Sequence, residues 1–203
     1  MMRKRWIVGG AAAVLIAVGG AVGYAKFVPE ATPPLANAAK LSAWDFKLTA
    51  IDGEPMPMSK YKGQVVLLVN SASKCGYTPQ YDGLQKLHLD YRPRGFTVLA
   101  VPSGDFLGQE FASNKEISGF CQTKFGIKFP MAEKGHVVGA GAIPIYRWAA
   151  GVLGPENTPK WNFHKYLIGR DGRLIAAFPT KTEPTDPVVT SAIEKALKAP
   201  AKA

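Results

Sequence analysis

The 203-residue chain is poor in the residues that build metal sites and disulfide scaffolds. It has only two cysteines, Cys75 and Cys121, and 47% of its residues are hydrophobic, which is enough for a core that needs no disulfide staple. The three histidines, His88, His136 and His164, are too dispersed to propose a metal site. We therefore expect a folded domain and propose neither a metal nor a cofactor for it.

Acidic residues are also in short supply. The formal net charge is +10, and because residues 1–25 hold three of the 25 basic residues and none of the 15 acidic ones, the rest of the chain keeps 22 basic residues against 15 acidic ones. The lysines are scattered and are not interleaved with aromatic residues in a stripe. The favoured interpretation is therefore the basic surface of a soluble domain, and no nucleic-acid partner is expected. An acidic or anionic partner is still an alternative.

The first 25 residues have the pattern of an export signal. Basic residues at positions 3–5 precede a stretch without charge at 6–25, which is close to the ~20 residues of a membrane span. Residues 1–25 are thus expected to be a signal peptide or an N-terminal membrane anchor, and either alternative places the domain in the periplasm or another extracytoplasmic space. If the segment stays uncleaved, it is the only part expected to contact the membrane. Residues 26–40, rich in proline and alanine, are interpreted as a spacer, and 41–203 as the domain.

Apolar patterns predict alternating strands and helices within this domain. The turn signals Asp52-Gly53 and Asp171-Gly172 interrupt the stretches 46–56 and 165–179, so both are expected to be β-hairpins. The other predicted elements are a buried strand at 64–72, a helix from Pro79 that stops before Pro93, a buried strand at 96–103, a helix at 113–125, a short strand at 127–131, and helices at 144–150 and 185–199.

The order of these elements indicates the fold class. The strand–helix–strand unit at 64–103 implies a right-handed crossover between parallel strands. Ser113 and Glu116 form a capping box that opens the fourth element of this series, and Gly126 ends it. The last helix should turn four side chains inward, namely Val188, Val189, Ile193 and Leu197. The whole order is that of a thioredoxin-like fold, an α/β fold with a central mixed sheet flanked by helices.

Cys75 stands in the stretch SASKCGYTPQY (71–81), where a strand is expected to end and a helix to begin. Backbone N–H groups and the helix dipole favour an anion at such a position, and Lys74 adds a positive neighbour. The alternative is a small buried hydrophobic residue. Cys-x-x-Cys and Cys-x-x-x-Cys chemistry is excluded because Thr78 and Pro79 occupy the second cysteine positions, and Ala72 stands where a peroxiredoxin has Thr or Ser.

Three motifs together resemble the glutathione peroxidase family, from about Ala43 to Leu197. They are NSASKCGYTPQY (70–81), FLGQE (106–110) and KWNF (160–163). The resemblance implies a peroxidase for hydrogen peroxide or organic hydroperoxides, with Cys75 as the peroxidatic residue and Gln109, Trp161 and Asn162 as the rest of a catalytic tetrad. Their neutral N–H groups suit a reaction that moves negative charge onto oxygen.

Two departures from the family pattern affect these expectations. Phe111-Ala112 replaces the family's usual Pro-Gly, which bears on how Gln109 is aimed. The link 150–160 lacks the insertion that tetrameric relatives use for assembly, so a monomer is expected.

The second cysteine stands in FCQTKFGIKFPM (120–131), which resembles the resolving segment of the family's thioredoxin-dependent branch. The resemblance implies that Cys121 attacks a sulfenic acid on Cys75 and that a thioredoxin-like dithiol, or glutathione, reduces the resulting disulfide. We expect Ile117 and Phe120 to fix this helix against the sheet, so that it must open before the disulfide forms. The alternatives are a redox relay or sensor, and a non-catalytic fold with a structural disulfide. Cys121 alone has a further alternative, a buried apolar residue beside Phe120.

Overall fold

The computed structural model describes residues 27–200, so the predicted leader at 1–25 lies outside the described part. A four-stranded sheet has the order β4-β3-β5-β6. Its strands are β3 (Val65–Ser71), β4 (Phe96–Pro102), β5 (Lys165–Ile168) and β6 (Leu174–Phe178). The first predicted hairpin is a separate antiparallel pair, β1 (Lys47–Thr49) with β2 (Pro55–Pro57).

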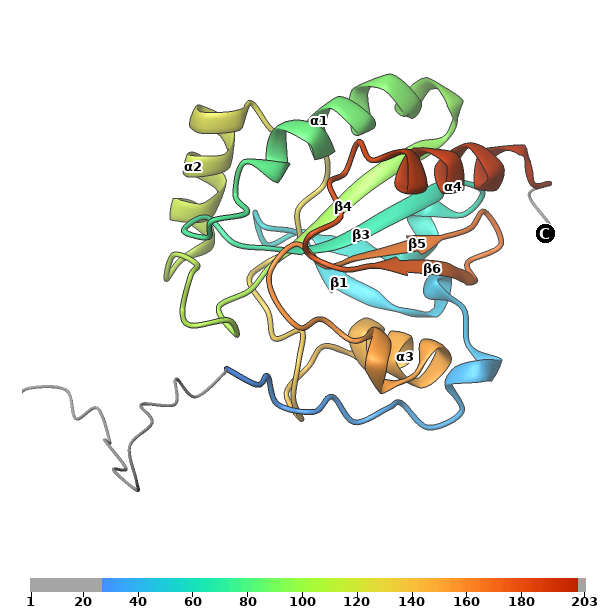
Figure 1. Cartoon of the computed structure of the whole chain (residues 1–203), viewed down its shortest axis with the longest axis horizontal. Coiled ribbons are helices and arrows are strands. Elements are labelled where there is room, and N and C mark those ends of the chain that lie inside the picture. The colour runs from blue at the N-terminus through green and yellow to red at the C-terminus, as the bar shows by residue number, and fades with distance from the viewer. Residues whose placement is uncertain (1–26, 201–203) are drawn as a thin grey trace, which may run out of the picture.

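The sheet is mixed, as the element order predicted. Strands β3 and β4 run parallel, from Val65 opposite Phe96 to Ser71 opposite Pro102, and α1 (Gln80–Tyr91) forms the crossover between them (Figure 1). Strand β5 is antiparallel to both β3 and β6. All residues of β3 and β4 are buried, which explains their continuous apolar sequence. This arrangement confirms the thioredoxin-like fold.

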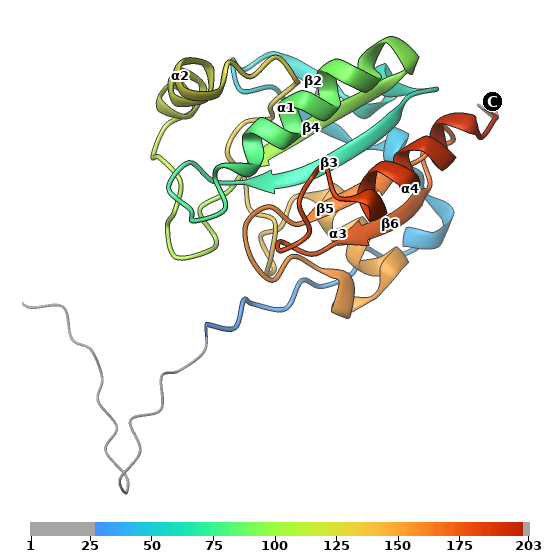
Figure 2. The same ribbon diagram turned by 45° about the horizontal axis from the view of Figure 1, so that its top comes forward.

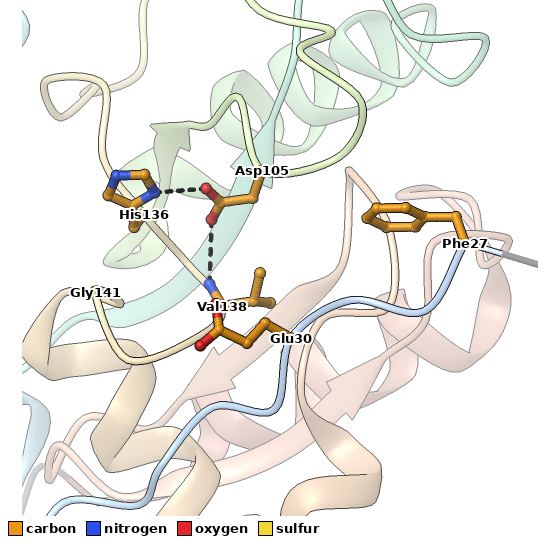
Figure 3. Close-up of a pocket in the computed structure, with 6 residues that line it drawn as sticks. All are labelled: Phe27, Glu30, Asp105, His136, Val138 and Gly141. Carbon is orange, nitrogen blue, oxygen red and sulfur yellow. Dashed lines mark hydrogen bonds and ion pairs between the residues drawn. The ribbon is translucent and has the colours of Figure 1, made fainter. Parts of the chain in front are cut away.

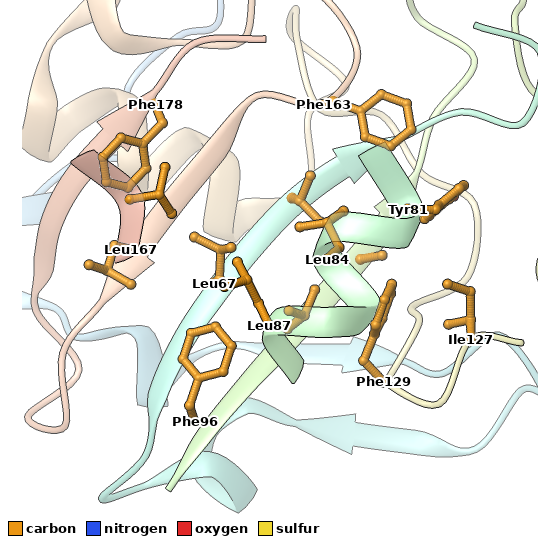
Figure 4. Close-up of a cluster of buried hydrophobic side chains, with 14 of the residues drawn as sticks. Leu67, Tyr81, Leu84, Leu87, Phe96, Ile127, Phe129, Phe163, Leu167 and Phe178 are labelled. Carbon is orange, nitrogen blue, oxygen red and sulfur yellow. The ribbon is translucent and has the colours of Figure 1, made fainter. Parts of the chain in front are cut away.

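Alternate residues of the strands supply two separate cores, one on each face of the sheet. Leu67 and Leu167 point to the face covered by α1 and α4 (Pro187–Lys198), where Leu84 and Leu87 of α1 pack beside them (Figure 4). The opposite face packs against α3 (Pro144–Leu153) (Figures 1 and 2). Burial on both faces fixes the register of the sheet and therefore the place where β3 ends.

The helix α2 (Asn114–Phe125) begins and ends where the sequence predicted. The Ser113 hydroxyl accepts the Glu116 N–H, the Glu116 carboxylate accepts the Ser113 N–H, and Gly126 adopts φ 57° at the C-cap. The helix packs beside α1. Ile117 is buried as expected, but Phe120 is only half-buried and packs on other aromatic rings.

Two local predictions are wrong. Residues 127–131 do not form a strand: only Met131 makes an isolated bridge, to Ala100, because Pro130 has no N–H to extend a ladder. Val188 is 56% exposed instead of facing inward. Val189, Ile193 and Leu197 share one face of α4 at helical spacing, and Val188 lies about 100° away from Val189 around the helix axis.

The segment interpreted as a spacer contacts the domain over its described part, residues 27–40. The Leu35 N–H donates to the Arg147 carbonyl, and the Trp148 indole donates to the Ala38 carbonyl, so this segment lies along α3. The division of the chain at residue 40 stays a prediction. None of the helices within residues 27–200 has the length and apolar character needed to cross a membrane.

Candidate functional site

Cys75 lies in the turn between β3 and α1. Its Sγ accepts a hydrogen bond from the Tyr77 N–H at 3.4 Å. The Cys75 N–H donates to the Thr78 hydroxyl at 3.0 Å, and that hydroxyl donates to the Ala72 carbonyl at 2.9 Å. Since α1 starts only at Gln80, the donor to the sulfur is an amide of the turn and not of the helix. The turn thus holds an N–H against a sulfur on a side chain that is 7% exposed.

Gln109 comes from the loop that follows β4. Leu107 at φ 58° and Gly108 at φ 65° both lie in the left-handed region, and they turn this loop back towards the Cys75 turn. The Gln109 carbonyl accepts the Lys74 N–H at 2.9 Å, and the Gln109 Oε1 accepts a hydrogen bond from the Asn162 Nδ2 at 3.0 Å. Gln109 therefore joins the residue before Cys75 to the predicted Asn.

Trp161 and Asn162 lie in the loop that leads into β5. Phe163 adopts φ 63°, an uncommon conformation for a residue with a bulky side chain. Its N–H donates to the Asn70 carbonyl at 2.6 Å, and the Asn70 side-chain amide donates to the Trp161 carbonyl at 3.1 Å. Asn162 is fully buried. Asn70, near the end of β3, therefore hydrogen-bonds this loop on both sides of Asn162.

An aromatic cluster surrounds Trp161. Its ring lies 5.7 Å from that of Phe106 and 5.5 Å from that of Phe27, between ring centroids. Trp161 also packs against the core cluster that contains Cys75. The structure thus brings the loops that carry the four predicted tetrad residues to one end of the sheet, and it adds Phe27, from the segment that precedes the domain.

Cys121 is fully buried in the second half of α2 and belongs to the same core cluster as Cys75. Both thiols are free. The hydroxyls of Tyr81 and Ser73 neighbour the Cys121 thiol, and burial, the largest influence, raises its pKa to about 11. The Cys121 backbone is held as well, since its carbonyl accepts the N–H of Gly126 at the end of the helix. At neutral pH this thiol is protonated and shielded from solvent.

Glu110 is a buried carboxylic acid next to Gln109. Its Oε1 accepts the N–H of Ser73 at 3.2 Å and that of Phe111 at 2.8 Å, whereas its Oε2 is buried without a partner. Burial raises the pKa of this carboxyl above its ordinary value, and the hydrogen bonds oppose that rise. The carboxylate therefore ties the loop after Gln109 to the turn that carries Cys75.

A cavity of about 470 Å³ shares one residue with the aromatic cluster, because Phe27 lines it (Figure 3). Phe27 and Glu30 line it from the N-terminal segment, and Asp105 and His136 line it from the domain. The Asp105 Oδ1 pairs with the His136 Nδ1 at 2.6 Å, and its Oδ2 accepts the Val138 N–H at 3.2 Å. None of its lining residues is Cys75 or another tetrad residue. Within residues 27–200, no three or more His, Cys, Asp or Glu residues gather as metal ligands would.

Several residues that support the site escaped the sequence analysis. Asn70, Thr78, Glu110 and Lys165 are polar and buried. A polar residue inside a continuous apolar run was the one available signal, and it applies to Asn70 alone. Phe27 carried no signal, because only the folded chain brings it to Trp161.

The family model for glutathione peroxidase matches residues 43–150. "Glutathione peroxidase" of Lactococcus lactis subsp. cremoris (strain MG1363) is 44% identical over 150 residues, which cover 72% of this chain and 94% of that protein. "Thioredoxin/glutathione peroxidase BtuE" of Escherichia coli (strain K12) is 39% identical over 169 residues, covering 72% and 92%. The crystal structure of "Trgpx in apo form" is 36% identical, with a TM-score of 0.63, and covers 79% of this chain and 97% of its own.

Proposed function

Since this chain belongs to the glutathione peroxidase family, we propose that its peroxidase activity proceeds through the thiolate of Cys75. The observation that carries the proposal is the bond between Asn162 and Gln109, because Gln109 also binds the residue beside Cys75. The Gln109 backbone and the Asn162 side chain are thereby linked to the turn that holds Cys75. Peroxide is the substrate that such a site suits.

The proposed first step is a displacement at oxygen. The Cys75 thiolate attacks one oxygen of the peroxide, the S–O bond forms, and the O–O bond breaks. The departing oxygen takes a proton and leaves as water or an alcohol, and Cys75 remains as a sulfenic acid. The N–H groups of Gln109, Trp161 and Asn162 are proposed to stabilise the negative charge on the departing oxygen, and none of them titrates near neutral pH.

We propose that Cys121 resolves the sulfenic acid. Its S–H bond breaks, an S–S bond to Cys75 forms, and the sulfenic hydroxyl leaves as water. The raised pKa and the burial of Cys121 support a resolving step that follows an opening of α2, because a protonated and enclosed thiol is a poor nucleophile. The separation that we expect between the two Cα atoms, beyond the ~7 Å of a disulfide, stays a prediction.

A thioredoxin-like dithiol is the reductant that we propose, with glutathione as the alternative. The relative named "Thioredoxin/glutathione peroxidase BtuE" supports both. Steady-state reduction of hydrogen peroxide and of an organic hydroperoxide, with thioredoxin and with glutathione as separate reductants, tests the assignment. We expect Cys75→Ser to abolish turnover, and Cys121→Ser to abolish turnover with thioredoxin while a single oxidation of Cys75 persists.

Other results would contradict parts of this proposal. Full turnover by Cys75→Ser would refute the role of Cys75. Unchanged turnover of Cys121→Ser with thioredoxin would refute resolution by Cys121. If neither reductant supported turnover but oxidised protein passed its disulfide to another protein, the redox relay would be favoured instead.

We further propose that the domain works as a monomer outside the cytoplasmic membrane. The charge pattern of residues 1–25, which lie outside the described residues, supports export. A reporter fused after Ala203 should be active only in an extracytoplasmic space, and activity in the cytoplasm would refute export. Release of the protein from membranes only by detergent would favour an anchor over a cleaved signal.

A further inference from the structure

Lys165, the first residue of β5, is a fully buried lysine. Its Nζ donates three hydrogen bonds of 2.7 Å, to the Gln80 side-chain oxygen and to the carbonyls of Phe163 and Thr182. No carboxylate within residues 27–200 lies at ion-pair distance from this nitrogen. An ammonium that is buried among neutral acceptors is unusual, because burial of an unpaired charge is unfavourable.

The three acceptors come from three segments of the chain that meet at the Lys165 Nζ. Gln80 is the first residue of α1, the helix that follows the Cys75 turn. Phe163 directly follows Asn162, and Thr182 belongs to the loop after β6. The Gln80 side chain also donates to the Thr180 carbonyl at 2.8 Å, which closes the connection between α1 and that loop. One ammonium thus links the loop of Trp161 and Asn162 to the start of α1.

The number of N–H groups on this nitrogen matters. An ammonium has three N–H groups and satisfies all three acceptors, whereas the neutral amine has two and leaves one acceptor without a partner. Burial lowers the pKa of Lys165 to about 7, and Glu183, beyond Gln80, opposes this. The neighbouring His164 is buried and its pKa is lowered to about 3, so it stays neutral in the same range. The bonding of the loop therefore changes close to neutral pH.

We propose that Lys165 is a positioning residue of the peroxidatic step: its protonated form fixes the Trp161–Asn162 loop against the start of α1, and loss of that proton loosens the loop. The inference rests on the proposed roles of Trp161 and Asn162. Phe163 is the point of action, because its φ of 63° makes this turn depend on surrounding bonds. A small displacement of a reacting donor can lower a rate ~10²-fold.

The test compares the rate of Cys75 oxidation in the full-length wild type and in Lys165→Met, from pH 6 to pH 9, by rapid mixing with hydrogen peroxide. The methionine side chain fills the space without donating hydrogen bonds. We expect the wild type to react about 10- to 100-fold faster at pH 6, and this ratio to fall as the pH rises to 9, where the neutral amine leaves one acceptor without a partner. The rate of Cys75 alkylation, measured in both proteins over the same pH range, separates an effect on the thiol itself from an effect on the donors. Lys195→Met, at an exposed position on α4, is the control and should match the wild type throughout.

A ratio that stays constant with pH would overturn the proposal, since a merely structural lysine would give that result. If Lys165→Met does not fold, an NMR titration of the wild type alone tests the proposal. The Trp161 indole N–H resonance should shift with the same pH midpoint as the Lys165 Nζ resonance. An indole resonance that does not shift would refute the effect of Lys165 on the Trp161–Asn162 loop. If Cys75→Ser is inactive and the rate ratio of wild type to Lys165→Met does not change with pH, only this inference is refuted. If Cys75→Ser is active, the proposed function on which the inference rests is refuted as well.

Discussion

Replacing Glu110 by glutamine is expected to stabilise the folded protein at pH 8. The side chain is 5% exposed, and its Oε2 is buried without a partner, so the charge of the carboxylate is only partly compensated. Burial raises the pKa of the carboxyl in spite of the hydrogen bonds from Ser73 and Phe111 and the positive charge of Lys134. All influences together therefore favour the neutral form, and glutamine is its neutral counterpart of the same shape.

The expected size follows from the two oxygens. Glutamine keeps an oxygen at the position of Oε1, so the N–H groups of Ser73 and Phe111 keep their acceptor. Its amide nitrogen replaces the unpartnered Oε2 and can donate to the hydroxyl of Ser73, which lies beside this carboxyl. A carboxyl pKa that folding raises destabilises the fold at pH values above that pKa. We expect Glu110→Gln to raise the free energy of unfolding by about 1 kcal/mol, the scale of one buried polar interaction.

The gain should depend on pH in one direction only. Above the raised pKa, the carboxyl is ionised in both the folded and the unfolded wild type, and the destabilisation is complete. As the pH falls through the raised pKa, the folded wild type binds a proton before the unfolded chain does, and this binding stabilises the folded wild type. The gap, meaning the difference in unfolding free energy between Glu110→Gln and the wild type, therefore narrows. Below the ordinary carboxyl pKa the gap is constant.

Urea unfolding of the reduced proteins from pH 5 to pH 8 measures this gap. Glu110→Ala is the matched control: it leaves two buried N–H groups without an acceptor and should lower the free energy of unfolding by about 2–5 kcal/mol. A Glu110→Gln protein that is less stable than the wild type at pH 8, or a gap that does not narrow in acid, would refute the reasoning.

Three further predictions concern the site itself. Gln109→Ala and Asn162→Ala should each slow Cys75 oxidation by about 10²–10³-fold. The double variant should slow it by less than the product of the two effects, because the two side-chain amides are hydrogen-bonded to each other. Wild-type rates in all three variants would refute the tetrad. Phe27→Ala should change the fluorescence of Trp161 and favour bulky hydroperoxides over hydrogen peroxide, and unchanged selectivity would show that Phe27 does not limit access. Hydrogen exchange should show α2 protected in the reduced protein and open after oxidation, and equal protection would refute the opening of α2.

The fold could be predicted because its signals are local and repeated. The continuous apolar strands β3 and β4, the capping box at Ser113 and the turn at Asp171-Gly172 each depend on a few neighbouring residues. The failures also have local causes. The proline within 127–131 removes a backbone N–H that a strand needs. Val188 is adjacent in sequence to the buried Val189 but points in another direction around the axis of α4, and it is therefore exposed.

The candidate site could be predicted only in part. The three motifs identify Cys75, Gln109, Trp161 and Asn162 as residues that belong together, but they do not say which bonds hold them. Those bonds join residues far apart in the sequence: Asn162 to Gln109 across 53 positions, and Asn70 to Trp161 across 91. No periodicity records such pairs. For the same reason a lysine in a β-strand gave no hint that its ammonium is buried.

The contrast between the two thiols gives the reaction its direction. Cys75 lies in a turn whose Tyr77 N–H donates to its sulfur, and Trp161 packs against the core cluster that contains Cys75. Cys121 lies within a capped helix, with a pKa raised to about 11 by burial. We propose that Cys75 meets peroxide first in the reduced protein, while complete burial protects Cys121 from direct oxidation. Any change that exposes Cys121 without oxidising Cys75, such as loss of the Ser113 cap, should therefore make Cys121 react with thiol reagents faster while leaving the first step intact. An unchanged rate of Cys121 alkylation in Ser113→Ala, measured beside a loss of helix stability of about 1 kcal/mol, would show that the helix does not control this thiol.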